Sequence, residues 1–159
     1  MRLRNQNMHI AFDLDDTLIP AEYRFPLEPV PKNFIRRFFC GERLRTGTPS
    51  LIRRLWSAGH IVSIYTTSFR NPFQTKLLFR AYRTRIHRMI NTPIHQRNIQ
   101  KLGEQYKHCT KFPPAFGIDL LIDNCLGVKG EAVRFNFSML HIDPADDRWC
   151  DTICDFLHL

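Results

Sequence analysis

Hydrophobic and polar residues along this chain alternate between two patterns. Short apolar runs typical of buried strands occupy residues 10–12, 61–65, 85–90, 118–122 and 138–142, the third being interrupted by charges. Apolar residues at helical spacing occupy residues 48–59, 71–82, 98–106, 128–134 and 149–157. Strand-like and helix-like segments therefore follow one another, which predicts an α/β fold with a parallel sheet covered by helices on both faces.

Residues 19–47 depart from this alternation. They contain four prolines, followed by an aromatic and basic stretch at 34–39. A segment of fewer than about 30 residues is too short to form a hydrophobic core of its own. We therefore expect a single domain, 1–159, in which 19–47 is a short excursion.

The composition is that of a soluble globular protein. Of the 159 residues, 43% are hydrophobic and 24% are charged, and no apolar run approaches the roughly 20 residues of a membrane span. The five cysteines are odd in number, widely spaced and without a Cys-x-x-Cys pair. These features favour reduced thiols, a cytoplasmic location and no membrane partner. Cys150, Cys154 and His158 share a helical stripe, which we interpret as a buried helix face because no fourth zinc ligand accompanies them.

Charge is unevenly distributed along the chain. Residues 70–111 contain ten Lys/Arg and one acidic residue, whereas residues 112–159 contain three Lys/Arg and eight acidic residues. The basic middle segment favours anionic ligands, from phosphoesters to nucleic acid, although a solvated helix face would look the same. Few aromatic residues are interleaved with these charges, as a nucleic-acid stacking surface would need. Nothing in the sequence indicates an oligomeric state.

The strongest chemical signal is a strand that ends in carboxylates. Ile10, Ala11 and Phe12 lead directly into Asp13, Asp15 and Asp16. In open α/β sheets, ligands bind beyond the carboxyl ends of the strands. Carboxylates this close repel one another unless a cation lies among them, and oxygen-only ligands suit Mg²⁺.

Two later strands end in polar residues that would meet these carboxylates. The strand at 118–122 delivers Asp123 and Asn124, and the strand at 61–65 delivers Thr66 and Thr67. Hydroxyls and backbone N–H groups ahead of a helix form an anion site, although they are also ordinary helix-capping residues. Arg70, four residues after Thr66, could add a bidentate phosphate contact.

The pattern Asp13-x-Asp15-x-Thr17 after a hydrophobic strand resembles the first motif of the haloacid dehalogenase (HAD) superfamily of phosphohydrolases. Thr66 resembles its second motif, and Asp123 its fourth. The motif lysine is ambiguous among Lys101, Lys107 and Lys111, of which we favour Lys111 because the rigid Pro113-Pro114 approach to the next strand follows it. Asn124 departs from the double-Asp form of the fourth motif, so Asp123 is expected to be the only charged metal ligand there.

The resemblance implies a HAD-like, Rossmann-like three-layer α/β/α fold in which 19–47 is a flap or minimal cap. It also implies a Mg²⁺-dependent phosphatase that acts through an aspartyl-phosphate. Asp13 would be the nucleophile and Asp15 the acid–base. Thr66, Thr67, Lys111 and Arg70 would bind phosphate, and the metal would be held by Asp13, Asp15, Asp123 and Asn124.

The substrate class stays open at this stage. A small phosphorylated molecule is the first expectation, and the basic segment at 70–111 makes a nucleic-acid end phosphatase an alternative. A non-catalytic phosphate-binding protein is a third, because of Asn124 and the absence of a full cap domain.

Overall fold

The structure is a computed structural model and describes residues 7–32 and 41–159. Its strands are β1 (His9–Phe12), β2 (Ile61–Tyr65), β3 (Met89–Ile90), β4 (Leu120–Asp123) and β5 (Met139–His141). Its helices are α1 (Thr48–Ser57), α2 (Pro72–Ala81), α3 (Thr92–Ile99), α4 (Leu126–Phe135) and α5 (Trp149–Leu157), with short 3₁₀ helices η2 (Glu104–Tyr106) and η3 (Pro113–Phe116).

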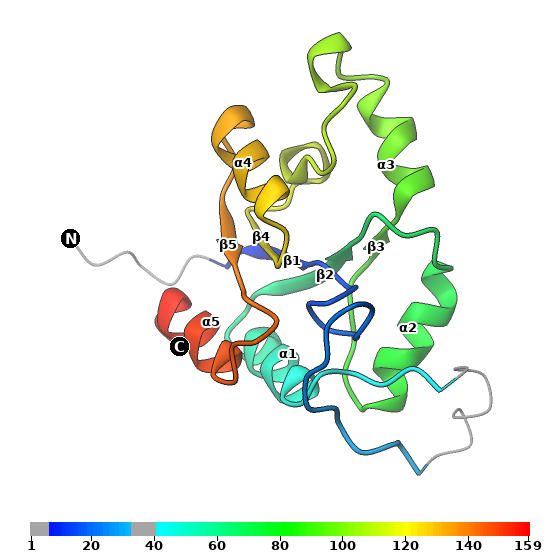
Figure 1. Ribbon diagram of the computed structural model, residues 1–159, viewed down its shortest axis with the longest axis vertical. Helices are drawn as coiled ribbons and strands as arrows, with labels where there is room; N and C mark the ends of the chain where they lie inside the picture. The colour runs from blue at the N-terminus through cyan, green and yellow to red at the C-terminus, as the bar shows by residue number, and fades with distance from the viewer. Residues whose placement is uncertain (1–6, 33–40) are drawn as a thin grey trace.

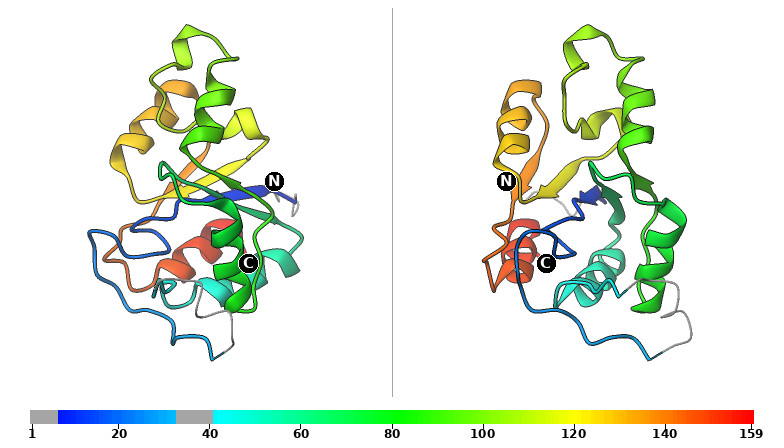
Figure 2. Two further views of the ribbon diagram at one scale, coloured as in Figure 1. Left: turned by 90° about the vertical axis from the view of Figure 1, so that its right-hand side faces the viewer. Right: turned by 45° about the vertical axis from the view of Figure 1, so that its right-hand side comes forward.

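The five strands form one open, parallel sheet in the order β3-β2-β1-β4-β5. Figures 1 and 2 show α1, α2 and α5 on one side of this sheet and α3 and α4 on the other. The fold is therefore a Rossmann-like three-layer α/β/α arrangement, as the alternation of strand-like and helix-like segments predicts.

Alternate strand residues supply two separate cores. Ile10, Phe12 and Ile122 pack with the helices α1, α2 and α5, whereas Ala11 and Leu121 pack toward Val128 of α4 on the other face. Successive side chains of a strand point to opposite faces, so a strand covered on both sides must be apolar throughout. This requirement explains the uninterrupted hydrophobic runs before Asp13 and Asp123.

One predicted helix is placed wrongly. The structure has α3 at Thr92–Ile99 instead of a helix over 98–106, where only the single turn of η2 occurs. The side chain of Asn91 caps α3 by accepting a hydrogen bond from the backbone N–H of Ile94, and Pro93 lies in the first turn. This capping pattern is the same as that of Asn71 and Pro72 at the start of α2.

The described part of the 19–47 excursion contains no helix and joins the main core through Ile19 and Leu44. Leu27 and Arg45 form an antiparallel bridge. The guanidinium of Arg45 is buried between the rings of Phe25 and Trp149 and donates to the carbonyl of Asp146. The excursion is thus attached to the start of α5, and the aromatic and basic stretch at 34–39 lies outside the described residues.

Four cysteines of the described chain, Cys109, Cys125, Cys150 and Cys154, are free thiols, as expected. None of the helices described is long and apolar enough to cross a membrane.

Candidate active site

Asp13 and Asp123 lie where the order of the strands reverses. β1 and β4 are adjacent, with Phe12 paired to Ile122, although more than a hundred residues separate them in the chain. The backbone N–H of Asp13 donates to the carbonyl of Ile122 at 2.8 Å. In doubly wound sheets this switch point, at the carboxyl ends of the strands, is where ligands bind. The two carboxylates predicted to meet are therefore brought together.

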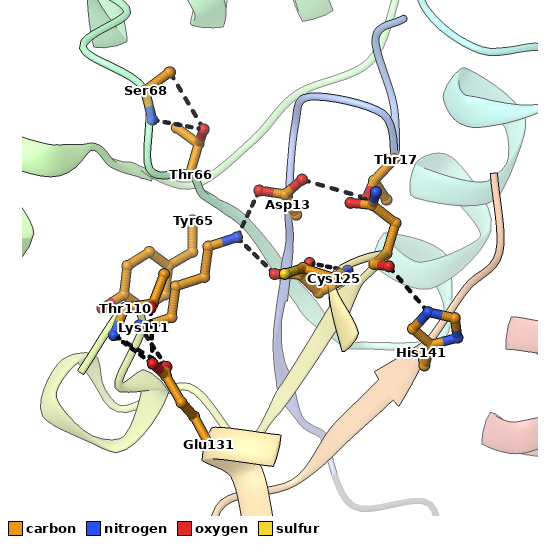
Figure 3. A network of polar contacts seen from close by, with 12 residues as sticks. Asp13, Thr17, Tyr65, Thr66, Ser68, Thr110, Lys111, Cys125, Glu131 and His141 are labelled. Atoms are coloured by element: carbon orange, nitrogen blue, oxygen red, sulfur yellow. Dashed lines mark hydrogen bonds and ion pairs between the residues drawn. The ribbon is translucent and has the colours of Figure 1, made fainter. Parts of the chain in front are cut away.

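Lys111 lies between these two carboxylates. Its Nζ donates to Asp13 Oδ1 at 2.5 Å and to Asp123 Oδ2 at 2.6 Å (Figure 3). All three side chains are at most 8% exposed, so the contacts are made in a medium of low polarity. Of the three candidate lysines, Lys111 is thus the one beside the carboxylates. Lys107 forms an exposed pair with Glu104, and Lys101 is exposed.

The electrostatics of this trio are uneven. The pKa of Asp13 is raised from its ordinary 3.8 to about 6, chiefly by burial and also by the nearby charge of Asp123, although Lys111 opposes the rise. Burial lowers the pKa of Lys111, but the two carboxylates outweigh it and the net pKa is raised. With Lys111 charged, two ionised carboxylates leave one negative charge uncompensated, which makes the site attractive to a further cation.

Asn124 and Thr17 form the side of the site next to Asp13. The hydroxyl of Thr17 donates to Asn124 Oδ1 at 3.2 Å and lies 3.4 Å from Asp13 Oδ2. A ring nitrogen of His141 on β5 contacts the backbone carbonyl of Asn124 at 2.9 Å (Figure 3). Asn124 is therefore held in place from two sides.

Thr66 and Thr67 follow β2 on the other side of Asp13. Thr66 is buried, and its Oγ1 accepts a hydrogen bond from the backbone N–H of Ser68 at 3.1 Å (Figure 3). The side chain of Thr67 is exposed, and its carbonyl accepts from the hydroxyl of Thr92. This turn presents hydroxyls at the carboxyl edge of the sheet, as the sequence predicts.

Asp15 and Arg70 are also brought together, but as partners of each other. Arg70 donates to Asp15 Oδ1 at 2.7 Å and also pairs with Glu42, at the end of the excursion. A phosphate could therefore reach Arg70, the predicted phosphate ligand, only by displacing one of these carboxylates. Both sides of its guanidinium are occupied by carboxylates, because Glu42, 28 residues earlier in the chain, folds against it.

Asp16 does not join the carboxylate cluster. Its φ of 63° turns it away, and its carboxylate accepts hydrogen bonds from the backbone N–H groups of Ala21, Glu22 and Tyr23. It organises the start of the excursion, a usual use of Asp in a turn.

The donors that remain suit Mg²⁺ in chemistry and in number. Asp13 and Asp123 supply two carboxylates, and the backbone carbonyl of Asp15 accepts no hydrogen bond from the described residues. Within residues 7–32 and 41–159, no three His, Cys, Asp or Glu side chains converge as a metal-binding group. Mg²⁺ needs no such group, because it is commonly held by one or two carboxylates, water and the substrate's phosphate.

Three residues that support Lys111 are absent from the sequence prediction. Glu131 of α4 accepts hydrogen bonds from the backbone N–H groups of Thr110 and Lys111. The hydroxyl of Tyr65 accepts from the N–H of Phe112, and His95 contacts the carbonyl of Cys109. No motif signals these contacts. The sequence gives a signal for one of these residues alone: Tyr65 carries a polar hydroxyl at the end of the buried β2 strand, directly before Thr66.

Comparison with known proteins adds information on the fold alone. No protein-family model matches the sequence, and no curated protein matches it. A chain in the structure described as "Structure of Pnkp1/Rnl/Hen1 complex" resembles this protein with a TM-score of 0.50 and 13% sequence identity. The match covers 92% of this chain and 51% of that chain, so this protein spans about half of its neighbour's length.

Proposed function

We propose that this protein is a Mg²⁺-dependent phosphohydrolase of the HAD type that acts through a phosphorylated Asp13. The observation that carries the proposal is the ammonium of Lys111, buried between Asp13 and Asp123 at the switch point of the sheet. A phosphoryl group that arrives beside Asp13 would meet a fixed positive charge. A dispersed anionic transition state requires positioning and positive charge above all.

The proposed reaction has two half-reactions on Asp13. A carboxylate oxygen of Asp13 attacks phosphorus while the bond from phosphorus to the leaving oxygen breaks, and Asp15 gives that oxygen a proton. Asp15 then takes a proton from the water that hydrolyses the acyl phosphate. Lys111 and the hydroxyl and backbone N–H groups around Thr66 and Thr67 stabilise the non-bridging oxygens.

Two residues of the site set conditions on this mechanism. Asp15 must give a proton to the leaving oxygen, but in the structure its carboxylate is engaged by the guanidinium of Arg70. A phosphate dianion competes with Asp15 for the guanidinium of Arg70. In the proposed mechanism, substrate binding therefore releases Asp15 at the moment when a proton is needed.

In this proposal, Mg²⁺ would be held by the carboxylates of Asp13 and Asp123 and the carbonyl of Asp15, with Asn124 beside them. When bound, it neutralises charge on the phosphate and helps to align it. Whether or not Mg²⁺ is bound, the carboxylates of Asp13 and Asp123 favour a raised pKa of Lys111 and so keep its ammonium charged.

The test is hydrolysis of an aryl phosphate with and without Mg²⁺. The wild-type protein should turn over only with Mg²⁺, and Asp13→Asn, which nearly preserves shape, should retain less than a few per cent of that rate while keeping a cooperative melting transition. Activity retained in a folded Asp13→Asn variant would exclude Asp13 as the nucleophile. Absence of turnover in the wild-type protein across a panel of phosphorylated metabolites and oligonucleotide ends would favour the non-catalytic phosphate-binding protein.

A second candidate, a nucleic-acid end phosphatase, is favoured by one observation. Phe69 and Phe73, on either side of Arg70 in the chain, are 76% and 70% exposed. They lie in the loop and first helical turn that follow β2, at the edge of the sheet that carries Asp13. Exposed aromatic rings beside cations can stack on nucleobases.

Binding of a phosphorylated oligonucleotide at increasing salt tests this second candidate. If the candidate is right, affinity should fall steeply with salt and should fall further in Phe69→Ala. Oligonucleotide binding that does not depend on salt or on Phe69 would leave small phosphoesters as the substrate class.

A further inference from the structure

Lys111 is carried by a loop. The segment Cys109–Phe112, here called the Lys111 loop, lies between η2 and η3 and belongs to no helix or strand. Its lysine must nevertheless place one nitrogen atom within 2.6 Å of two carboxylates. A lysine side chain has four rotatable bonds, so a well-placed ammonium requires a well-placed backbone.

Glu131 fixes one side of the Lys111 loop. Both of its carboxylate oxygens lie 3.0 Å from the backbone N of Thr110, and one accepts from the Thr110 hydroxyl at 2.7 Å. The backbone N–H of Lys111 also points to this carboxylate, at 3.4 Å. Glu131 stands on α4, the helix that follows Asp123, so one strand–helix unit provides both an anchor for the backbone of Lys111 and a partner for its ammonium (Figure 3).

Tyr65 and His95 fix the other side through a chain of hydrogen bonds with a defined direction. The backbone N–H of Phe112 can only donate, so Tyr65 Oη accepts at 2.9 Å. The Tyr65 hydroxyl then donates to His95 Nδ1 at 2.6 Å. The carbonyl of Cys109 can only accept, so His95 Nε2 carries the proton of the last bond, at 2.9 Å. This order requires a neutral His95, and burial lowers the pKa of His95 accordingly.

We propose that Glu131 and the Tyr65–His95 pair are positioning residues, which hold the Lys111 loop so that the ammonium stays between Asp13 and Asp123. Neither supplies an atom that the proposed reaction uses, although the ring centroid of Tyr65 lies 6.0 Å from Nζ of Lys111. The role in catalysis rests on the proposed phosphohydrolase function, whereas the role in placing the ammonium does not.

The first experiment reads the ammonium directly. In protein labelled with ¹⁵N-lysine, the buried ammonium of Lys111 should give a slowly exchanging NMR signal that is absent from Lys111→Met. Glu131→Gln and, independently, Tyr65→Phe should accelerate its hydrogen exchange roughly tenfold to a hundredfold, because each removes anchoring of the loop.

Two matched substitutions serve as controls. Glu104→Gln changes an exposed glutamate that only pairs with Lys107. Tyr82→Phe removes a tyrosine hydroxyl at the C-terminal cap of α2, close to Leu44 and Arg43 instead of the Lys111 loop. Both should leave the exchange of the Lys111 ammonium unchanged. Unchanged exchange in both Glu131→Gln and Tyr65→Phe would overturn the proposal.

The second experiment separates positioning from general stability. Glu131→Gln should lower kcat for an aryl phosphate roughly tenfold to a hundredfold, as a small displacement of a catalytic group does. In a Lys111→Ala background, the same substitution should change kcat by less than about twofold, although it still lowers the melting temperature. An equal loss of kcat in both backgrounds would show a purely structural role and would overturn the proposal.

The two experiments keep this inference distinct from the function on which it rests. A wild-type protein with no turnover would contradict the phosphohydrolase proposal, and the exchange of the ammonium would still decide whether the loop is held as proposed.

Discussion

Two ion-pair clusters of this protein use the same chemistry in different surroundings. In the buried cluster, Lys111 joins Asp13 and Asp123, and the side chains are 1–8% exposed. In the outer cluster, Arg70 joins Asp15 and Glu42, and the side chains are 29–36% exposed. Removing one member of a buried pair leaves a charge that water cannot reach, whereas an exposed pair contributes little to stability.

The comparison assigns different tasks to the two clusters. The buried one can keep a positive charge at a constant position through a reaction cycle. The outer one can exchange partners at low cost, because water replaces whichever partner leaves. A nucleophile and its counter-charge need the first property, and an acid–base residue that must gain and lose a proton needs the second.

The largest effect is expected for Lys111→Ala. It should lower turnover roughly 10²- to 10³-fold and unfolding free energy by roughly 3–5 kcal/mol, because Asp13 and Asp123 are left buried without their counter-charge. Lys107→Ala and Lys101→Ala, at exposed positions, should stay within about 0.5 kcal/mol of wild type. Kinetics and chemical denaturation measure both quantities, and a larger loss at Lys107 would move the functional lysine there.

Magnesium should stabilise the buried cluster. A cation that binds the folded protein alone adds about 2.7 kcal/mol at a hundred times its Kd, so the melting temperature should rise with Mg²⁺ concentration. Asp123→Asn should abolish this rise. Asp119→Asn, a control in the same segment whose carboxylate accepts from the N–H of His9, should retain it. An undiminished rise in Asp123→Asn would exclude Asp123 as a ligand.

The pH dependence of stability should reveal the buried carboxyl of Asp13. Its pKa rises from 3.8 in the unfolded chain to about 6 in the folded protein, mainly through burial. The folded state therefore holds the proton longer, and stability from this group falls as pH rises from about 4 to 6. Asp13→Asn has no such carboxyl and should not lose this stability, which is on the order of 2–3 kcal/mol. Its melting temperature relative to that of the wild type should therefore increase as pH rises across this range.

A difference between Asp13→Asn and wild type that stays constant over this pH range would contradict the raised pKa. Metal-free buffer is required for this comparison, because a bound cation would itself lower the pKa of Asp13.

The smallest effect on stability is expected in the outer cluster. Arg70→Ala should cost less than about 1 kcal/mol, in line with exposed ion pairs. Its effect should appear in kcat instead, because the carboxylate of Asp15 loses the partner that holds it in place. Arg80→Ala, at an exposed position of α2, is the control. A loss of stability comparable to that of Lys111→Ala would remove the distinction between the two clusters.

The sequence predicts the elements whose signals are local. The apolar runs before Asp13 and Asp123 predict two buried strands, and because parallel strands end at one edge, they predict that these carboxylates meet. The rigid Pro113-Pro114 approach favours Lys111, which the structure places beside Asp13 and Asp123. The Asn91-Thr92-Pro93 start of α3 is also a local signal, but the apolar spacing predicts this helix at 98–106, later in the chain than α3 lies.

The remaining features depend on contacts between distant residues. The sequence predicts that Arg70 is a phosphate ligand, and only the folded structure shows that it pairs with Glu42. Glu131 resembles any acidic residue of an exposed helix until α4 lies beside the Lys111 loop. His95 likewise gains its partners from Tyr65 and Cys109, 30 and 14 residues away. Hydrophobic periodicity and helix-capping residues carry no information about contacts between residues that are far apart in the sequence.

Detection of the covalent intermediate tests the central claim most directly. An aryl phosphate has a good leaving group, so the Asp15→Asn variant should still transfer phosphate to Asp13 but release it slowly. Mass spectrometry of acid-quenched protein should find the phosphate on the peptide that contains Asp13 and should find none in Asp13→Asn. Phosphate on another residue, or steady hydrolysis with no phosphorylated protein at any time, would contradict the account.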